Sequence, residues 1–530
     1  MTFSLPPNPS LENLKKQAKT LQKNWEAADP ATLARVRAAH PRFTETPDQQ
    51  LCAIQPQLSD CQLILAREYG FSSWPQLKAA VEASQQELAA EFVTIACLCY
   101  DDPHFDHRSF HARAHQMLVD HPELAAANIW SAAAAGNVDA VRSFLDTNPA
   151  LTAAPGPHQW LPLICASYSR VRPLHPNHST YEVAKLLLDR GADPNAFTLK
   201  HNDPPGSDRA RRFTALTGVF GNGSTGLANQ PPHPQWRELA ELLLNRGADP
   251  NDPQALWINQ TASLEILLRH GLNDSALMGR ELSRAARSGR IHLVRTLLAH
   301  GAQIDEKFEG KTPWLHAVDS GHLEVARLLE EAGAPAADLD PVRQFTSLCL
   351  AGDERSVRAM LDQDPDLLSR APKDLARRAA HEGGSPKALQ LTLDLGFDPN
   401  YIDDNSALCM VAARGDEAFA RILIAGGASL TLRDPWYDST PVGWADFYDQ
   451  THMRDWLLDE CAIDLFDALD YHRLDRVPEI LARDPAALNR PFAECLTREP
   501  KEKDWQTPLA RMLDRGNLEA VHLLEHLGAR

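Results

Sequence analysis

Long apolar runs are missing from this 530-residue sequence. No stretch reaches the roughly 18 uninterrupted apolar residues that a membrane span requires. The first residues, MTFSLPPNPSLENLKK, place adjacent prolines and then charges where a secretory signal needs an apolar run of about 7 to 15 residues. The sequence therefore predicts a cytoplasmic protein without a membrane span.

Paired cysteines and an excess of basic charge are also missing. The nine cysteines are scattered and never form a CxxC pair, which favours reduced, mostly buried thiols over a disulfide framework or a zinc site. The formal net charge is −18, whereas a nucleic-acid partner demands a basic face. We therefore expect no nucleic-acid partner, although residues 1–42 hold seven Lys or Arg against three Asp or Glu.

Motifs of catalysis and nucleotide binding are lacking as well. Neither GxSxG nor HExxH occurs. The segment GNGSTG at 221–226 matches the letters of a dinucleotide loop but runs into LANQPPHPQ instead of a helix. The segment EGKTP at 309–313 lacks the upstream glycine of a phosphate-binding loop. We expect no cofactor, and a catalytic activity is the less favoured interpretation.

One histidine-rich segment, DDPHFDHRSFHARAHQMLVDH at 101–121, has two interpretations. If its second part is helical, His107, His111 and His115 step by four residues along one face. Imidazoles so spaced can bind zinc or another divalent ion. Because the sequence offers no second set of ligands, a polar helix face is favoured, and these three histidines stay the candidate metal ligands.

The chain is longer than the roughly 250 to 300 residues at which a single hydrophobic core stops growing, so it contains several domains or a repeat array. One sequence phrase recurs along it. It consists of a Gly, a polar residue and an amphipathic segment that ends in a Leu-rich pair. Its copies are GNVDAVRSFL from Gly136, GRIHLVRTLL from Gly289, GHLEVARLLE from Gly321, GDERSVRAML from Gly352, a degenerate GSPKALQLTL from Gly384, GDEAFARILI from Gly415 and GNLEAVHLLE from Gly516. Between 289 and 415 the copies begin 31 or 32 residues apart, which predicts a stacked array of helical units.

Two further phrases give each unit its ends. DRGADPN at 189–195, NRGADPN at 245–251, HGAQID at 300–305 and LGFDPN at 395–400 combine a helix-ending glycine with turn residues. KTPWLHAV at 311–318, STPVGWAD at 439–446 and QTPLARML at 506–513 open the next unit. In these, Thr can cap a new helix whose first turn contains Pro. We also expect Leu328 to lie on a buried helix face.

These phrases, in this order and at this spacing, resemble the ankyrin repeat, a β-turn followed by two helices. The resemblance implies an all-α solenoid of about twelve helix-turn-helix units with short hairpin connections over residues 128–530. It weakens between 247 and 271, where a unit is truncated, and from Ile463, where the Thr-Pro opening is lost. Residues 86–127 are interpreted as an irregular or degenerate helical repeat.

Residues 1–85 are predicted to form a helical N-terminal cap. The segments LPPNPSLENLKKQAKTL and LSDCQLILAREYGFSSWPQLKAAVE resemble a short segment that precedes ankyrin repeats in many bacterial proteins. Ser10 is a candidate helix cap, with Leu11, Leu14, Ala18 and Leu21 on one face. A docking role for a basic face of Lys15, Lys16, Lys19 and Lys23 is the alternative.

Three insertions interrupt the first repeats, at 167–180, 197–212 and 218–235. Insertions at equivalent places lie on one face of a solenoid, often its binding face, although surface loops also lengthen at little cost. The cationic and aromatic groups gathered there suit an acidic or phosphorylated partner. The candidate partner-binding residues are Tyr168, Arg170, Arg172, His175, His178, Arg211 and Arg212.

Aromatic residues also recur where the repeats open. Most are expected to pack in the core, but Trp436 and Tyr437, just before the Thr440-Pro441 opening, are candidate anchors because binding energy concentrates in Trp, Tyr and Arg. The sequence therefore predicts a scaffold that recognises a protein or peptide with its concave face and its insertions. The alternative is a small-molecule or metal-dependent binder or enzyme whose pocket is formed by the insertions and the His107, His111 and His115 helix.

Overall fold

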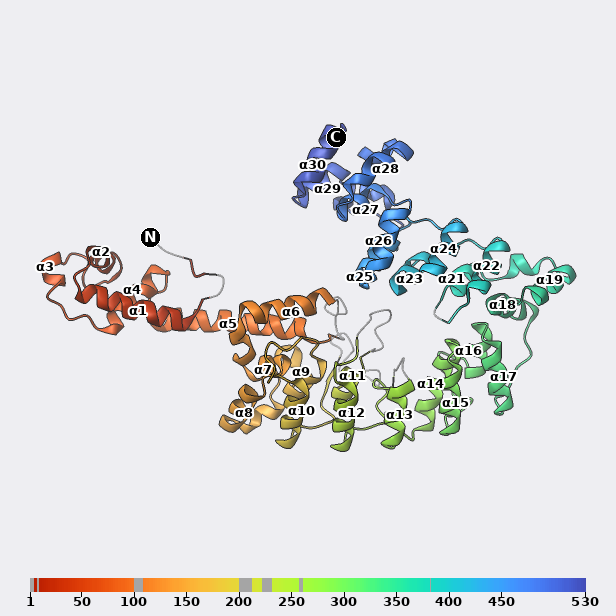
Figure 1. The fold of residues 1–530 in the computed structure, drawn as a ribbon, viewed down its shortest axis with the longest axis horizontal. Helices are drawn as coiled ribbons and strands as arrows, with labels where there is room; N and C mark the ends of the chain where they lie inside the picture. Colours follow the sequence, from red (N-terminus) through yellow and green to blue (C-terminus); the bar gives the residue numbers. More distant parts are fainter. Residues whose placement is uncertain are drawn as a thin grey trace. The chain divides into compact units, whose positions relative to one another are not determined.

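The computed structural model describes residues 4–6, 9–99, 108–199, 212–221, 231–256, 261–381 and 383–530 (Figure 1). The fold is predominantly helical, as predicted, and it divides into two compact units. Unit 1 contains the described residues up to Ala248, and unit 2 contains those from Asp249 onward. Within the described residues, every helix is too short or too polar to cross a membrane.

Unit 1 begins with a small helical segment. Its helices are α1 (Leu11–Glu26), α2 (Pro30–Ala39), α3 (Asp48–Leu51), α4 (Leu58–Glu68) and α5 (Trp74–Ala96). Ser10 caps α1 by accepting a hydrogen bond from the Asn13 amide at 3.3 Å, and α1 packs its buried face against α4. Helix α5 runs through the expected boundary at residue 85, so a continuous helix joins the two predicted segments.

The rest of unit 1 consists of paired helices and one small sheet. Its elements are α6 (Arg108–Asp120), η2 (Pro122–Ala126), α7 (Ile129–Ala135), α8 (Val138–Thr147), η3 (Pro149–Ala153), η4 (Pro157–Gln159), α9 (Pro162–Tyr168), α10 (Thr180–Asp189), β1 (Phe197–Leu199), β2 (Arg212–Thr214), α11 (Ala215–Phe220) and α12 (Trp236–Asn245). Helix α9 packs between α7 and α11, and α10 packs between α8 and α12. The strands β1 and β2 are antiparallel, with Phe197 opposite Thr214.

Unit 2 continues the pairing of helices (Figure 1). Its elements are α13 (Thr261–Arg269), α14 (Ser275–Arg287), α15 (Ile291–Ala299), α16 (Pro313–Asp319), α17 (Leu323–Glu331), α18 (Pro341–Ala351), α19 (Glu354–Gln363), α20 (Leu367–Arg370), α21 (Leu375–Ala379), α22 (Pro386–Asp394), α23 (Ala407–Arg414), α24 (Glu417–Ala425), α25 (Pro441–Phe447), α26 (Thr451–Glu460), α27 (Leu465–Asp470), η5 (Leu474–Arg476), α28 (Val477–Arg483), η6 (Pro485–Asn489), η7 (Phe492–Cys495), η8 (Glu502–Trp505), α29 (Pro508–Asp514) and α30 (Leu518–His526). The count of about twelve units stays a prediction.

The recurring sequence phrases form the ends of these helices. Thr312, Thr440 and Thr507 cap α16, α25 and α29 by accepting hydrogen bonds from backbone amides three residues further on, at 3.3 to 3.4 Å. Gly321 has a φ of +77°, and a Cβ there would lie 2.5 Å from the carbonyl carbon of Leu350. Glycine is therefore favoured at this recurring position for two reasons: it adopts a left-handed conformation, and it has no Cβ to clash with the next repeat.

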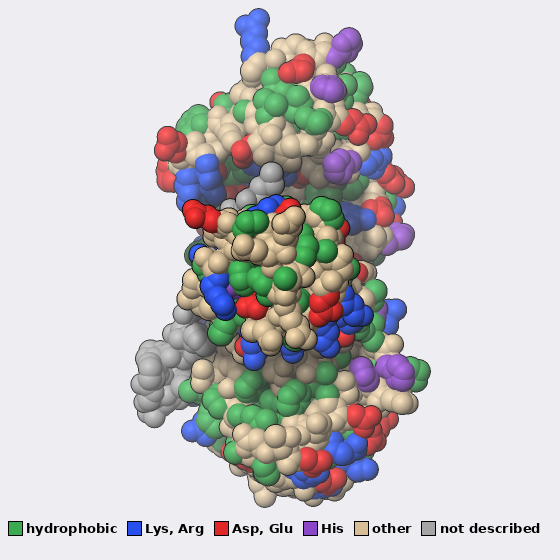
Figure 2. All heavy atoms as spheres, turned by 90° about the vertical axis from the view of Figure 1, so that its left-hand side faces the viewer, with side chains coloured by type: hydrophobic (Ala, Val, Ile, Leu, Met, Phe, Trp, Pro, Cys, Tyr) green, Lys and Arg blue, Asp and Glu red, His purple; other side chains and the backbone are tan. Residues whose placement is uncertain are grey.

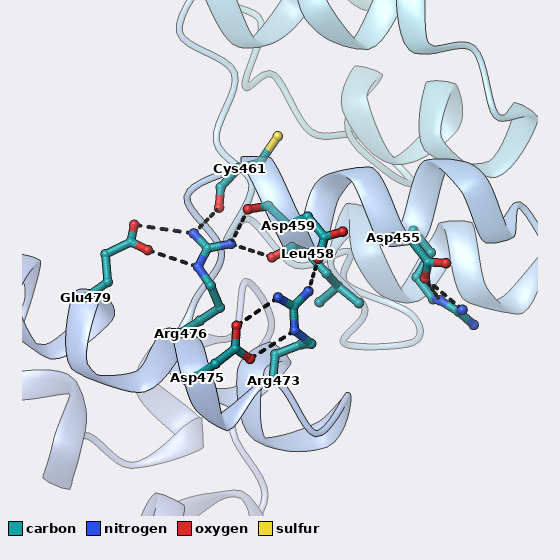
Figure 3. A network of polar contacts seen from close by, with 9 residues as sticks. Asp455, Leu458, Asp459, Cys461, Arg473, Asp475, Arg476 and Glu479 are labelled. Carbon is teal, nitrogen blue, oxygen red and sulfur yellow. Dashed lines mark hydrogen bonds and ion pairs between the residues drawn. The ribbon is translucent and has the colours of Figure 1, made fainter.

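The repeat that lost its Thr-Pro opening is held by other side chains (Figure 3). Asp464 replaces the threonine as cap of α27, accepting from the Asp467 amide at 2.8 Å. Arg476 donates to the carbonyl oxygens of Asp459 and Cys461 at 2.9 and 3.1 Å and pairs with Glu479 (Figure 3). These carbonyls lie at the C-terminal end of α26, where carbonyl groups lack partners within the helix, and that of Cys461 also accepts from the Ile463 amide at 3.0 Å.

Leu329, and not Leu328, lies on the buried face of α17. The exposed fraction of Leu329 is 0%, whereas Leu328 is only partly buried, so the expected register is wrong by one residue. We expect Leu329→Ala to lower the free energy of unfolding of unit 2 by roughly 3 kcal/mol, because it removes buried methyl groups and leaves a cavity. Urea denaturation followed by circular dichroism measures this loss. Leu328→Ala is the matched control, and an equal or larger loss for it would contradict the register.

We expect Glu281, in α14, to make the stability of unit 2 depend on pH. Its side chain is buried beside Arg284, 2.9 Å away, and burial raises the pKa of Glu281 to about 7 although Arg284 and Arg290 lower it. Because the native state holds this proton more tightly than the unfolded state, the stabilisation is present below about pH 4.5 and is lost as the pH rises through about 7.

We therefore expect the free energy of unfolding to fall by roughly 1 to 3 kcal/mol between about pH 5 and pH 8. Glu281→Gln removes the titrating group and should flatten this part of the profile. Urea denaturation at several pH values measures both slopes. Parallel profiles for the wild-type chain and the variant would contradict the assignment to Glu281.

Candidate partner-binding surfaces

A buried carboxylate shapes the turn at 434–439, which precedes α25. Asp434 is 1% exposed. Its Oδ1 accepts hydrogen bonds from the amides of Trp436 and Tyr437 at 2.9 and 2.7 Å. Its Oδ2 accepts from the Ser439 amide at 2.9 Å and from the indole Nε1 of Trp444 at 3.0 Å. Four donors on one carboxylate fix the backbone of this turn.

The fixed turn presents two aromatic side chains to solvent. Trp436 is 70% exposed and Tyr437 is 60% exposed. Tyr437 meets Trp444 edge to face at 5.8 Å, Trp444 stacks on Tyr448 at 5.7 Å, and Tyr448 meets Phe447 at 5.1 Å. We call the five side chains the aromatic row: Trp436, Tyr437, Trp444, Phe447 and Tyr448.

The aromatic row packs on a small apolar cluster that is distinct from the main core of unit 2. Trp444 clusters with Cys409 and Ala413 of α23, whereas Leu408 and Ala412 of that helix belong to the main core. These positions lie on different stripes of the helix. Burial raises the pKa of the Cys409 thiol to about 12, so Cys409 is a packing residue and not a nucleophile.

The turn is also held from a distant part of the chain. Asp438 has a φ of +56°, and its carboxylate accepts from the Nε of Arg498 at 2.7 Å. Arg498 pairs in addition with Asp504 at 2.9 Å. Sequence reasoning missed Asp434, Asp438 and Arg498. The Asp-Pro at 434–435 is a turn signal that could have indicated Asp434, but no local pattern links Asp438 to Arg498.

In unit 1, two of the predicted binding residues hold the fold together. Tyr168 is fully buried, and its hydroxyl donates to the carbonyl oxygen of Thr214 at 3.0 Å. The guanidinium of Arg170 donates to the carbonyls of Pro231 and Ser169 at 2.8 and 3.0 Å, and also to Gly218 and Ser167. Tyr168 is therefore not available at the surface, whereas Arg170 is partly exposed and its predicted binding role stays a prediction.

Removing the Arg170 side chain should loosen that anchor. Arg170→Ala leaves carbonyls at both ends of the 218–235 insertion without their donor. We expect a loss of about 2 kcal/mol in local stability. Hydrogen exchange of peptides covering α11 and α12 measures this loss, and exchange in α14 is the internal control. Unchanged exchange in α11 and α12 would contradict the anchoring role.

The other predicted residues of unit 1 are distributed over two places. Arg172 and His175 are exposed, and the ring of His175 lies 5.7 Å from that of the partly buried His178. Burial lowers the pKa of His178, with a smaller contribution from His175. Arg211 lies outside the described residues. Arg212 is exposed, and its guanidinium lies 4.8 Å from the ring centroid of Phe197.

The described part of the histidine-rich segment is helical, as expected, and forms α6. His107 lies outside the described residues, and His111 is 8% exposed within α6. The Nδ1 of His115 lies within hydrogen-bond distance, 3.1 Å, of the carbonyl oxygen of Arg172. Over the described ranges, no group of three or more His, Cys, Asp or Glu side chains is placed to hold a metal ion.

A charged cleft of about 500 Å³ opens in unit 2 next to α16 and α18. Asp319, in its wall, pairs with Lys311 at 2.7 Å and with Arg343 at 3.0 Å. Arg287, in the same wall, pairs with Glu309 at 3.0 Å. Each of these three cations is therefore already paired with a carboxylate. Basic and acidic side chains are likewise intermixed over the face of the chain that Figure 2 shows.

Comparisons with known proteins agree with the repeat pattern. The family model for three copies of the ankyrin repeat matches residues 254–341, and the single ankyrin-repeat model matches residues 158–199. The chain therefore contains ankyrin repeats in both units, which confirms the resemblance as far as the repeat is concerned. These matches cover α9, α10 and β1 in unit 1 and α13 to α17 in unit 2.

Two curated relatives come from nematodes. The ankyrin repeat and KH domain-containing protein mask-1 of Caenorhabditis elegans is 32% identical over 139 residues, which are 25% of this chain and 5% of that protein. The corresponding protein CBG24701 of Caenorhabditis briggsae is 31% identical over 138 residues, with the same shares. The chain thus spans a small part of the length of these relatives. A crystal structure of an ankyrin repeat domain from Acinetobacter baumannii has 21% identity and a TM-score of 0.20, and covers 34% of this chain and 96% of that domain.

Proposed function

We propose that this chain is a binding scaffold that holds a protein or peptide partner on the surface of unit 2 that carries the aromatic row. Ankyrin repeats in general indicate protein–protein interaction, and this proposal assigns that role to one surface. The observation that carries it is the pair Trp436 and Tyr437, 70% and 60% exposed on a turn that four hydrogen bonds to Asp434 hold in place.

Rigidity supports the proposal as much as exposure does. Binding loses free energy whenever side chains and loops become ordered, and a turn that is already ordered avoids this loss. Tyr437 is further restrained by its edge-to-face contact with Trp444. Trp and Tyr also lead the residue types that dominate binding energy at protein interfaces.

Unit 1 offers a second, smaller candidate surface in the same scaffold. Phe197 and Leu199 on β1 are 41% and 44% exposed, and Arg212 on β2 lies over the Phe197 ring. These groups, together with the exposed Arg172 and His175, form the second candidate surface, which lies at the insertions. An acidic or phosphorylated partner at this face stays part of the proposal.

A peptide library displayed on phage and selected against the whole chain tests the proposal without assuming the charge of the partner. We expect enriched peptides whose affinity falls at least tenfold for the double variant Trp436→Ala with Tyr437→Ala, because the anchors are removed. Leu518→Ala, at a side chain that is 64% exposed in α30, is the matched control. Enriched peptides that bind the double variant as tightly as the wild-type chain would overturn the proposal for this surface.

A further inference from the structure

The surface around the aromatic row is acidic. The turn at 401–406 and the segment 433–449 together contain six Asp and one Arg, without any Lys. The single Arg is Arg433, which is 5% exposed and pairs with Asp464 at 2.6 Å. Asp403 and Asp404 are exposed, and Asp438 is partly exposed. Arg433 is therefore buried and does not add positive charge to the surface, whereas Asp438, next to Tyr437 in sequence, is partly exposed.

The two acidic segments are neighbours in the stack. The side-chain oxygen of Asn400 accepts from the Ser429 amide at 2.7 Å, and its nitrogen donates to the Gly427 carbonyl at 2.9 Å. These bonds join the first turn to residues 427–429, which lead to the second turn. Helices α23 and α25, which begin directly after the turns, pack against each other. The turn at 401–406, which carries Asp403 and Asp404, therefore adjoins in the stack the turn that carries Trp436 and Tyr437.

Two cations on neighbouring helices are paired with carboxylates. Arg377, from α21, pairs with Asp403 at 3.4 Å and with Asp374 at 3.7 Å. Arg454, from α26, pairs with Asp446 at 2.9 Å. The segment 497–504 carries three basic and three acidic residues: Arg498, Lys501, Lys503, Glu499, Glu502 and Asp504. Negative charge therefore prevails at this surface.

We propose that the aromatic row binds a cationic peptide segment whose arginine or lysine side chains stack on Trp436 and Tyr437 while the exposed carboxylate of Asp404 attracts their charge. The inference rests on the proposed function and specifies its ligand chemistry. The faces of indole and phenol rings attract cations, and Trp does so best. A guanidinium combines this stacking with hydrogen bonds to carboxylates. An acidic segment would instead meet like charge.

Fluorescence anisotropy with two synthetic peptides tests the inference. One is a fluorescein-labelled peptide of alternating arginine and serine, and the other has glutamate in place of arginine. The whole chain should bind the arginine peptide and not the glutamate peptide. Trp436→Ala with Tyr437→Ala, which leaves the net charge unchanged, should weaken binding of the arginine peptide by about tenfold.

Charge variants separate a local effect from the general attraction of an acidic chain. Asp404→Asn should weaken binding of the arginine peptide by about threefold. Asp362→Asn, which removes an exposed carboxylate of α19, is the matched control and should leave the affinity unchanged. Equal losses for Asp404→Asn and Asp362→Asn, full affinity in the double aromatic variant, or tight binding of the glutamate peptide would each overturn the inference.

The peptides selected from the phage library distinguish this inference from the proposed function. Peptides that need Trp436 and Tyr437 and are rich in arginine or lysine support both. Peptides that need the two aromatic residues but carry no basic residue leave the proposed function in place and overturn the cationic chemistry.

Discussion

Replacing Arg433 with methionine is expected to lower the free energy of unfolding of unit 2 by about 4 kcal/mol. The guanidinium is buried, lies 2.6 Å from Asp464 and 3.7 Å from Asp467, and donates to the carbonyl oxygen of Asp438 at 3.0 Å. Its Cζ also lies 4.9 Å from the ring centroid of Phe492. Without it, two carboxyl groups stay in a site of low polarity without their counter-charge.

The pH dependence of this loss gives a second check. Burial and the neighbouring Asp464 raise the pKa of Asp467 to about 8, although Arg433 lowers it. A carboxyl without its cation becomes easier to accommodate once it is protonated. We therefore expect the loss caused by Arg433→Met to be smaller at about pH 5 than at about pH 8.

Hydrogen exchange of the slowest amides in α25 and α27 measures the stability of this region. A local measurement is needed because the two units of the chain need not unfold together. Arg358→Met is the matched control, because Arg358 is 61% exposed and pairs only on the surface with Glu354. We expect a change below about 0.5 kcal/mol for this control. Similar losses for the two variants would contradict the role assigned to Arg433.

Asp434→Ala is expected to cost about 4 kcal/mol, because it leaves three backbone amides and the indole N–H of Trp444 without their acceptor. The effect should be largest in the turn at 434–439, whose amides should exchange with solvent at close to the rate of an unstructured chain. The buried Trp444 should also become more mobile, since its indole loses the bond that orients it.

Asp434→Asn is the conservative comparison. The asparagine amide keeps one acceptor oxygen, so we expect a smaller loss of stability than for Asp434→Ala. Hydrogen exchange of the 434–448 segment measures both variants. Protected turn amides in Asp434→Ala would show that the carboxylate does not hold the turn, and the argument for a rigid aromatic row would then fail.

The repeat architecture could be predicted from the sequence because its determinants are local. A glycine that ends one helix and a threonine that caps the next lie within a few residues of the structure they specify, as Gly321 and Thr440 show. The exposed pair Trp436 and Tyr437 could be singled out for the same reason, since both directly precede such a cap. The sequence does not distinguish Leu328 from Leu329, because two adjacent leucines leave the helix register uncertain by one residue.

Residues with distant partners could not be assigned from sequence. Tyr168 and Arg170 have the composition of a binding site, but their partners lie 46 to 61 residues further along the chain, at Thr214, Gly218 and Pro231. Arg498 contacts Asp438 across 60 residues. Such pairs depend on how neighbouring repeats stack, and a single sequence does not contain that distance information.

Hydrogen exchange of the whole chain with and without a saturating, library-selected peptide tests the central claim most directly, because it locates the bound peptide without any substitution. We predict slower exchange in the segment 434–448, where the aromatic row lies, and in the adjoining turn at 401–406. Slower exchange that is confined to other parts of the chain, with unchanged rates at 434–448, would contradict the account.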